Sequence, residues 1–170
     1  MLQPRDGEVA TGDIMITAVL WPSGHRFQEM PEVPYRREAV GRSRMNTLLV
    51  AIGGAIGAAG RYLIGGWVQS FAGSGFPLGT FFVNVTGSLV IGLILGLSER
   101  GSLSGQARLL LAVGMMGGYT TFSSFSYDNL GLLQSGETGR LLLNIAGQFA
   151  IGLFAAYLGV VVARALGGYA

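Results

Sequence analysis

Four long apolar segments, separated by short polar loops, make up most of the chain after residue 44. They cover approximately residues 47–68, 79–98, 107–133 and 140–163. A helix needs about 20 apolar residues to cross the hydrocarbon core of a bilayer, and each segment reaches that length. The pattern therefore predicts an all-α, multi-pass membrane protein with four transmembrane helices.

The third segment, residues 107–133, has a polar interruption near its middle. Between Gly114 and Asp128 the sequence reads GMMGGYTTFSSFSYD, with two adjacent glycines and, shortly after them, two adjacent threonines. Glycine and β-branched residues are poor helix formers, so we expect the helix to break at residues 117–121. Backbone groups freed at membrane depth must face protein or water, and such breaks are typical ion-binding positions.

Polar residues also recur at helical spacing in the second and fourth segments. Thr80, Asn84 and Ser88 follow one another at intervals of four residues, as do Asn144 and Gln148. Each set therefore lies on one face of its helix. Polar side chains are costly against lipid, so both faces should point into protein or water. They are either contacts that hold helices together or walls of a polar path.

Glycines in the first, second and fourth segments predict faces that pack closely. Gly53 and Gly57 open such a stripe in the first segment, and similar glycines recur in the second and the fourth. Small residues at this spacing let helix backbones approach one another in membranes.

Composition agrees with a membrane protein and narrows its function. Half of the 170 residues are hydrophobic and 12% are charged, with a formal net charge of +2. There is no basic patch, so we expect no nucleic-acid partner. Cysteine is absent, and the single histidine, His25, precedes the apolar segments. Without paired carboxylates or a phosphate-binding loop motif, the chain is not expected to be an enzyme.

Residues 1–44 differ in character from the rest of the chain. They hold six of the eleven basic residues and six of the nine acidic residues. Their apolar run, residues 14–21, is too short to span a bilayer, and it lacks the layout of a signal peptide. We expect residues 1–44 to be a disordered or weakly structured extension, and residues 45–170 to form the membrane domain.

Three blocks of sequence together resemble the Fluc/CrcB family of fluoride channels. They are GxxGAxxRY, ending at Tyr62, GTFFVNVTGS, ending at Ser88, and GGYTTFSSFSYD, ending at Asp128. The resemblance extends from about residue 45 to residue 168. It implies an antiparallel, dual-topology-type dimer in the cell membrane, through which cytoplasmic fluoride leaves passively and fluoride toxicity falls.

The resemblance also implies roles for individual residues. The fluoride pathway would be lined by an amide, two phenyl edges and hydroxyl groups, from Asn84, Phe122, Phe125, Thr80, Thr121, Ser123 and Ser124. Gly117 and Thr120 would offer backbone carbonyls to a structural sodium ion (Na+) at the dimer interface. Arg61 would lie near a vestibule. Asp128 stands where the family usually has glutamate, and Gln148 where a pore-facing serine is expected.

The residues by themselves leave simpler interpretations open. Phe122 and Phe125 are equally well explained as core side chains. Arg61 lies close enough to its segment end for the guanidinium to reach the lipid headgroups. The role of Gln148 is also undecided, because a larger amide in place of serine would narrow or rearrange the pathway.

The arginines leave the composition of the dimer open. With both termini on one side of the membrane, that side collects Arg42, Arg44, Arg100, Arg108 and Arg164, and the other side has Arg140. This excess favours a single orientation with both termini in the cytoplasm. An antiparallel homodimer needs both orientations, so the partner is either a second copy or an oppositely oriented paralogue.

Two other functions remain possible from the sequence. A small four-helix, dual-topology exporter has a similar size, although the carboxylates here lie near segment ends. An accessory membrane subunit would need no ion pathway at all.

Overall fold

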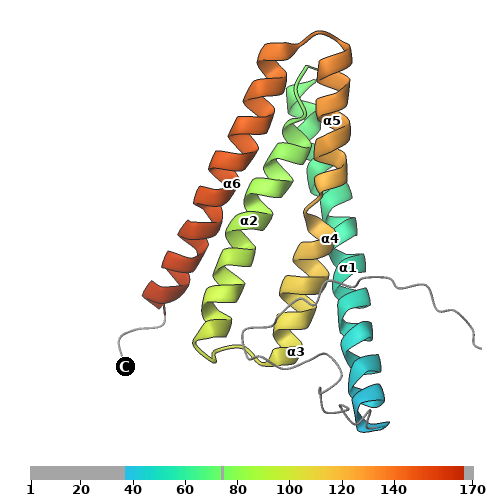
Figure 1. The fold of residues 1–170 in the computed structure, drawn as a ribbon, viewed down its shortest axis with the longest axis vertical. Helices are drawn as coiled ribbons and strands as arrows, with labels where there is room; N and C mark the ends of the chain where they lie inside the picture. The colour runs from blue at the N-terminus through green and yellow to red at the C-terminus, as the bar shows by residue number, and fades with distance from the viewer. Residues whose placement is uncertain (1–36, 74, 167–170) are drawn as a thin grey trace, which may run out of the picture. The chain divides into compact units, whose positions relative to one another are not determined.

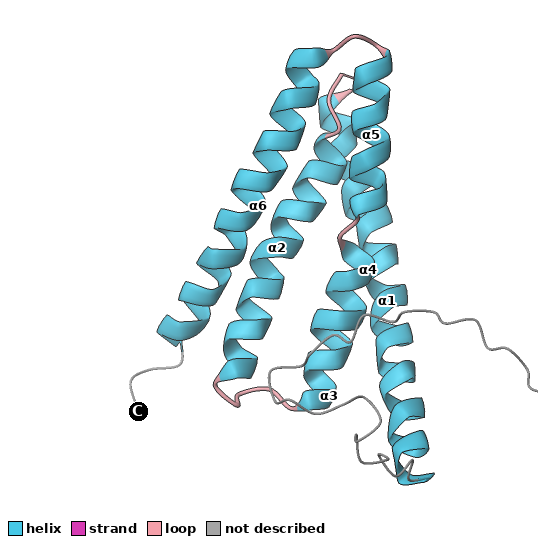
Figure 2. Cartoon of the chain, in the orientation of Figure 1, coloured by secondary structure: helices cyan, strands magenta, loops and turns pink. Residues whose placement is uncertain are grey.

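The computed structural model describes residues 37–73 and 75–166, and every regular element in them is a helix (Figures 1 and 2). Three helices are long: α1 (Arg37–Ala72), α2 (Leu78–Glu99) and α6 (Thr138–Leu166). The predicted third segment is divided into α3 (Gly105–Arg108), the π-helical stretch η2 (Leu109–Met116), α4 (Gly117–Tyr119) and α5 (Phe122–Gln134). The predicted all-α class is confirmed.

Four crossings of a membrane follow from these elements. Helices within Ser43–Ala72, Leu78–Glu99 and Thr138–Leu166 are each long and apolar enough to span by themselves. The pieces α3, η2, α4 and α5 follow one another from one end of the bundle to the other (Figure 1). The protein is therefore a helical multi-pass membrane protein.

The proposed division of the chain at residue 45 stays a prediction. Helix α1 begins at Arg37, so residues 37–44 of the expected extension are helical. The rest of that extension, residues 1–36, lies outside the described residues.

The break in the third segment falls within the predicted range, although its cause differs from the expected one. Gly117 and Gly118 remain helical, whereas Thr120 (φ −78°, ψ 156°) and Thr121 (φ −151°, ψ 120°) are extended. Figure 2 shows this interruption as a short loop between α4 and α5. Gly118 instead allows close packing, because a Cβ there would collide with the backbone carbonyl of Gly54.

Two close packing contacts hold the helices in pairs. Helix α1 lies along η2 and α4, and α2 lies along α6. A Cβ on Gly57 would collide with the carbonyl of Met115, and one on Gly92 with the carbonyl of Ala156. Backbones can approach this closely only where glycine supplies no side chain, which confirms the predicted close-packing role of these glycines.

Basic residues gather at one end of the bundle. The start of α1, the end of α2, α3 and the end of α6 share that end (Figure 1). Arg44, Arg100, Arg108 and Arg164 belong to these positions. The arrangement of the elements agrees with the sidedness expected from the sequence.

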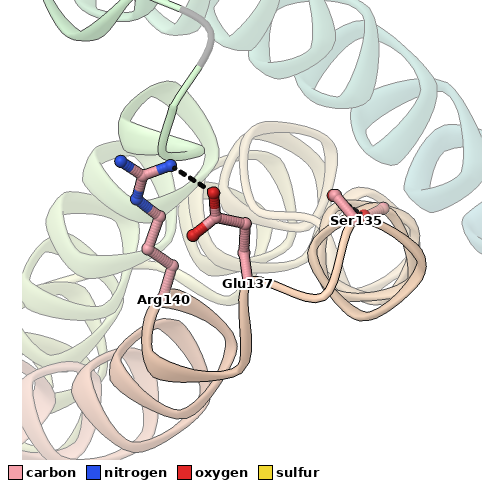
Figure 3. Close-up of polar contacts among 4 residues, drawn as sticks. Ser135, Glu137 and Arg140 are labelled. Atoms are coloured by element: carbon pink, nitrogen blue, oxygen red, sulfur yellow. Dashed lines mark hydrogen bonds and ion pairs between the residues drawn. The ribbon is translucent and has the colours of Figure 1, made fainter.

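The opposite end carries the α5–α6 turn, where Glu137 and Arg140 form an ion pair. Arg140 Nη1 lies 3.2 Å from Glu137 Oε1 (Figure 3). Both side chains are about half exposed, so the pair contributes little to stability. The turn itself depends on Gly136, whose φ of 72° suits a residue without a Cβ.

We predict that Gly57→Ala destabilises the bundle by about 1–3 kcal/mol, because the new methyl group must push α1 away from η2. The thermal unfolding midpoint of the protein in detergent measures this loss. Gly66→Ala is the matched control on the same helix, since a Cβ at that position would meet no other atom within 4 Å. Equal midpoints for the two variants would contradict the packing role of Gly57.

Candidate functional site

The side chain of Asn84 on α2 pairs with the backbone of Thr121 at the helix break. The Thr121 N–H donates to Asn84 Oδ1 at 2.8 Å, and Asn84 Nδ2 donates to the Thr121 carbonyl at 3.1 Å. An unpaired N–H or carbonyl at membrane depth costs several kcal/mol. Asn84 therefore satisfies the Thr121 N–H, which has lost its helical acceptor. It also adds a second donor to the Thr121 carbonyl, which as the N-cap of α5 already accepts the first bond of that helix.

The same rearrangement deprives the carbonyls of residues 117–120 of their helical donors. In a continuous helix, the N–H of Thr121 would donate to the Gly117 carbonyl, and that of Ser124 to the Thr120 carbonyl. Here the Thr121 N–H is directed to Asn84, and the Ser124 N–H donates to Thr121 Oγ1 at 3.2 Å. The affected carbonyls include those of Gly117 and Thr120, which the resemblance assigned to a cation. Carbonyl oxygen is a suitable ligand for a hard cation.

Hydroxyl groups gather on the other side of the break, at the N-terminus of α5. Thr121 Oγ1 lies 3.0 Å from Ser123 Oγ, and 3.2 Å from Ser124 Oγ. The N-terminus of a helix carries the positive end of its dipole, which favours anions. The break therefore has two chemically different sides: carbonyls at the end of α4, and hydroxyls with a positive helix end at the start of α5.

The two phenylalanines of the predicted pathway lie directly after the break. The ring centroids of Phe122 and Phe125 are 5.6 Å apart, with an angle of 37° between the ring planes. Phe122 is 80% exposed in the single chain. It is therefore not a core side chain of this subunit, and its ring is available to a second subunit or to a passing ion.

A cavity of about 630 Å³ lies between α1, α2 and α5. Five of the predicted site residues line it together: Arg61, Thr80, Thr121, Ser124 and Asp128. Asp128 Oδ2 is buried and has no hydrogen-bond partner among the described residues. Asn84, Phe122, Ser123, Phe125, Gly117 and Thr120 are not part of the cavity wall, although Asn84 and the break adjoin it through Thr121.

A chain of amide side chains leads away from Asn84 into the bundle. Asn84 Nδ2 donates to Gln148 Oε1 at 2.8 Å, Gln148 Nε2 donates to Asn144 Oδ1 at 2.9 Å, and Asn144 Nδ2 donates to Asn129 Oδ1 at 2.9 Å. The inward orientation predicted for Asn144 and Gln148 is confirmed. Asn129 was not foreseen, because the sequence offers no sign beyond one amide in a helix that already carries many polar residues.

The third membrane crossing is discontinuous, and carbonyls, hydroxyls and an amide meet at its break. These features define a class, the multi-pass membrane proteins that bind or transport ions at a broken helix. Residues 48–160 match the family described as CrcB-like protein, camphor resistance (CrcB). The chain belongs to this family.

Relatives with high identity carry one name. A fluoride-specific ion channel FluC from Thermus thermophilus is 56% identical over 121 residues, which cover 71% of this chain and 95% of the relative. Fluoride-specific ion channel FluC 1 from Methanosarcina acetivorans is 46% identical over 124 residues, 72% of this chain and 93% of the relative. A FluC from Geobacter metallireducens is 42% identical over 123 residues, 72% of this chain and 99% of the relative.

We predict that Asn84→Leu lowers the free energy of unfolding by about 1–3 kcal/mol, because the Thr121 N–H then loses its partner. Thermal unfolding of the purified protein, followed by circular dichroism, gives the comparison. Asn46→Leu near the start of α1 makes the same exchange away from the break. If the Asn84 variant unfolds at the wild-type temperature, Asn84 does not hold the break.

Proposed function

We propose that this protein is a passive, fluoride-selective ion channel that lets cytoplasmic fluoride leave the cell and so lowers its toxicity. The observation that carries the proposal is the helix break, where an amide, a cluster of hydroxyls and a positive helix end meet at membrane depth. The names of the relatives support fluoride as the ion. The function is transport rather than catalysis.

The pathway replaces the water around the ion by weak donors. Fluoride accepts hydrogen bonds, and Thr80, Thr121, Ser123 and Ser124 supply hydroxyl donors along the cavity and the start of α5. Asn84 supplies an amide. The edges of Phe122 and Phe125 carry partial positive charge and can contact the ion without holding it. Conduction requires binding that is favourable enough for the ion to enter and weak enough for it to leave.

The charged residues of the cavity belong to its entrance. Arg61 raises the local concentration of anions, since a cationic wall in a narrow space attracts them. Asp128 lines the same space, and its carboxylate offsets part of that positive charge. The two together leave the entrance attractive to an anion without trapping it.

The pathway is completed by a second, antiparallel subunit. Gly117 is exposed in the single chain, and its carbonyl has lost its helical donor. Phe122, directly after the break, is exposed as well. Lipid offers no hydrogen bonds to a freed backbone group, so this face is not suited to contact lipid. A subunit that covers it would bring the second set of phenylalanines and carbonyls to the first.

A structural sodium ion fits the carbonyl side of this interface. The described residues contain no cluster of three His, Cys, Asp or Glu side chains that could hold a metal. The carbonyls of Gly117 and Thr120 would hold the ion, together with those of the partner. Sodium would neutralise their partial charge and stabilise the dimer, and it takes no part in conduction.

The partner chain is either a second copy or an oppositely oriented paralogue. Four arginines lie at one end of the bundle and Arg140 at the other, and this asymmetry favours a single orientation. A homodimer needs the chain to insert both ways. The efflux experiment below distinguishes the two partners.

We expect rapid fluoride efflux from liposomes that hold this chain, measured with a fluoride electrode. A channel passes fluoride without a proton gradient and excludes chloride, whereas a proton-coupled exporter depends on the gradient. An accessory subunit gives no efflux under any condition. If the chain alone is inactive, reconstitution with the oppositely oriented paralogue tests the heterodimer, and inactivity of that pair as well would rule out the channel.

The site assignment is checked in the same liposomes with two phenylalanine variants. Phe122→Ile should slow efflux about two- to tenfold, the value of a single aromatic contact. Phe154→Ile on α6 is the control, because Phe154 is also exposed, at 63%, on the face opposite buried Gly152. Equal efflux through the two variants, with assembly intact, would remove Phe122 from the pathway.

Sodium should stabilise the dimer in a concentration-dependent way. Exchange of sodium for choline at constant ionic strength is expected to lower the thermal unfolding midpoint, and re-addition should restore it. At about 100 times the dissociation constant, a bound ion adds roughly 2.7 kcal/mol. A thermal unfolding midpoint that does not change with sodium concentration would argue against the carbonyl site.

A further inference from the structure

The orientation of the Asn84 amide is fixed by backbone alone. Its Oδ1 accepts from the Thr121 N–H, which can only donate, and its Nδ2 donates to the Thr121 carbonyl, which can only accept. These two bonds determine which end of the amide is oxygen and which is nitrogen. No other residue is needed to hold Asn84 in this position.

One N–H of Asn84 remains after these bonds, and it is taken by Gln148. Asn84 Nδ2 lies 2.8 Å from Gln148 Oε1. A primary amide has two N–H donors, so the bonds to Thr121 and Gln148 use both of them. In this structure, Asn84 therefore has no free donor for an anion. The Gln148 carbonyl accepts the hydrogen bond that this N–H would otherwise donate to an ion.

The Gln148 carbonyl is aimed at Asn84 by the groups behind it. Gln148 Nε2 donates to Asn144 Oδ1, and Asn144, which is fully buried, donates in turn to Asn129 Oδ1. Each amide therefore donates to the next one, from Asn84 on α2 through Gln148 and Asn144 on α6 to Asn129 on α5. If the Gln148 amide turned over, oxygen would face oxygen at Asn144, so the carbonyl end stays toward Asn84.

We propose that Gln148 sets the fluoride affinity of the channel, because its side-chain carbonyl competes with the ion for the last N–H of Asn84. The inference rests on the proposed function and assigns a role to a residue whose part in the pathway the sequence left open. An arriving fluoride displaces the carbonyl, and the carbonyl returns as the ion leaves. The N–H is thus never without an acceptor, and the ion is released easily.

The test is the dependence of efflux on fluoride concentration in the Gln148→Met variant. Methionine has nearly the same length and no acceptor of comparable strength, so Asn84 keeps its bonds to Thr121 and gains a free N–H. We expect the half-saturating fluoride concentration to fall about two- to tenfold, the effect of removing one competing hydrogen bond. The maximal rate should fall as well, since tighter binding slows release. Gln106→Met on α3 is the control, because Gln106 is exposed at the end of the bundle.

A second variant gives an effect of opposite sign. Gln148→Glu places a stronger acceptor beside Asn84, and the amides of Asn144 and Asn129 turn over so that Asn144 donates to the second carboxylate oxygen. The half-saturating concentration should therefore rise, and it does so even if the methionine variant assembles poorly. An unchanged half-saturating concentration in both variants, or loss of conduction in an assembled Gln148→Met protein, would overturn the competition. Wild-type liposomes distinguish a failure of this inference from a failure of the proposed function: if they conduct and both Gln148 variants behave as wild type, only this inference fails. If neither the chain nor its pair with the paralogue conducts, the proposed function fails with it.

Discussion

The two hydrogen bonds between Asn84 and Thr121 are the constraint on which this structure depends. A helix broken inside a membrane exposes backbone groups that lipid cannot satisfy, so the break exists only because α2 delivers an amide to it. That delivery requires a close approach of the helices. A Cβ on Gly87, less than one turn after Asn84, would collide with the Thr120 side chain. Gly87 thus permits the close approach of α2 to the break, and Asn84 makes the hydrogen bonds across it.

One break produces two opposite chemistries because a helix has two different ends. The preceding helix ends in carbonyls without helical donors at Gly117 and Thr120, and α5 begins with the hydroxyls of Thr121, Ser123 and Ser124. The first side suits a cation and the second an anion. A continuous helix would offer neither, since all its interior backbone groups bond to one another. A single break can therefore offer groups that suit an anion and groups that suit a cation, while the described residues contain no cluster of three His, Cys, Asp or Glu side chains that could hold a metal.

The sequence predicted what depends on local pattern and missed what depends on contacts between distant segments. Apolar length gave the crossings, and the run of poor helix formers placed the break within residues 117–121. The sequence did not show that Thr120 and Thr121, rather than the glycines, would be extended. That outcome depends on the position at which Asn84 of α2 bonds to the third segment. The bond between Asn84 and Gln148 joins residues 64 positions apart, and no periodicity within one helix reports such a pair. The common cavity of Arg61 and Asp128 is of the same kind.

The hydrogen bonds of Asn84 differ in how readily each can be exchanged. Those to the Thr121 backbone cannot be given up without leaving the Thr121 N–H unsatisfied at membrane depth, so they are structural. The bond to Gln148 joins two side chains, and its loss frees one N–H of Asn84 and the carbonyl of Gln148. An incoming anion can accept from that N–H, and the flexible side chain can turn its carbonyl toward a hydroxyl. The proposed conduction uses both kinds of bond: those to the Thr121 backbone keep the donor in a fixed place, and the one to Gln148 yields to the ion. The position of Asn84 between Thr121 and Gln148 provides both from a single side chain.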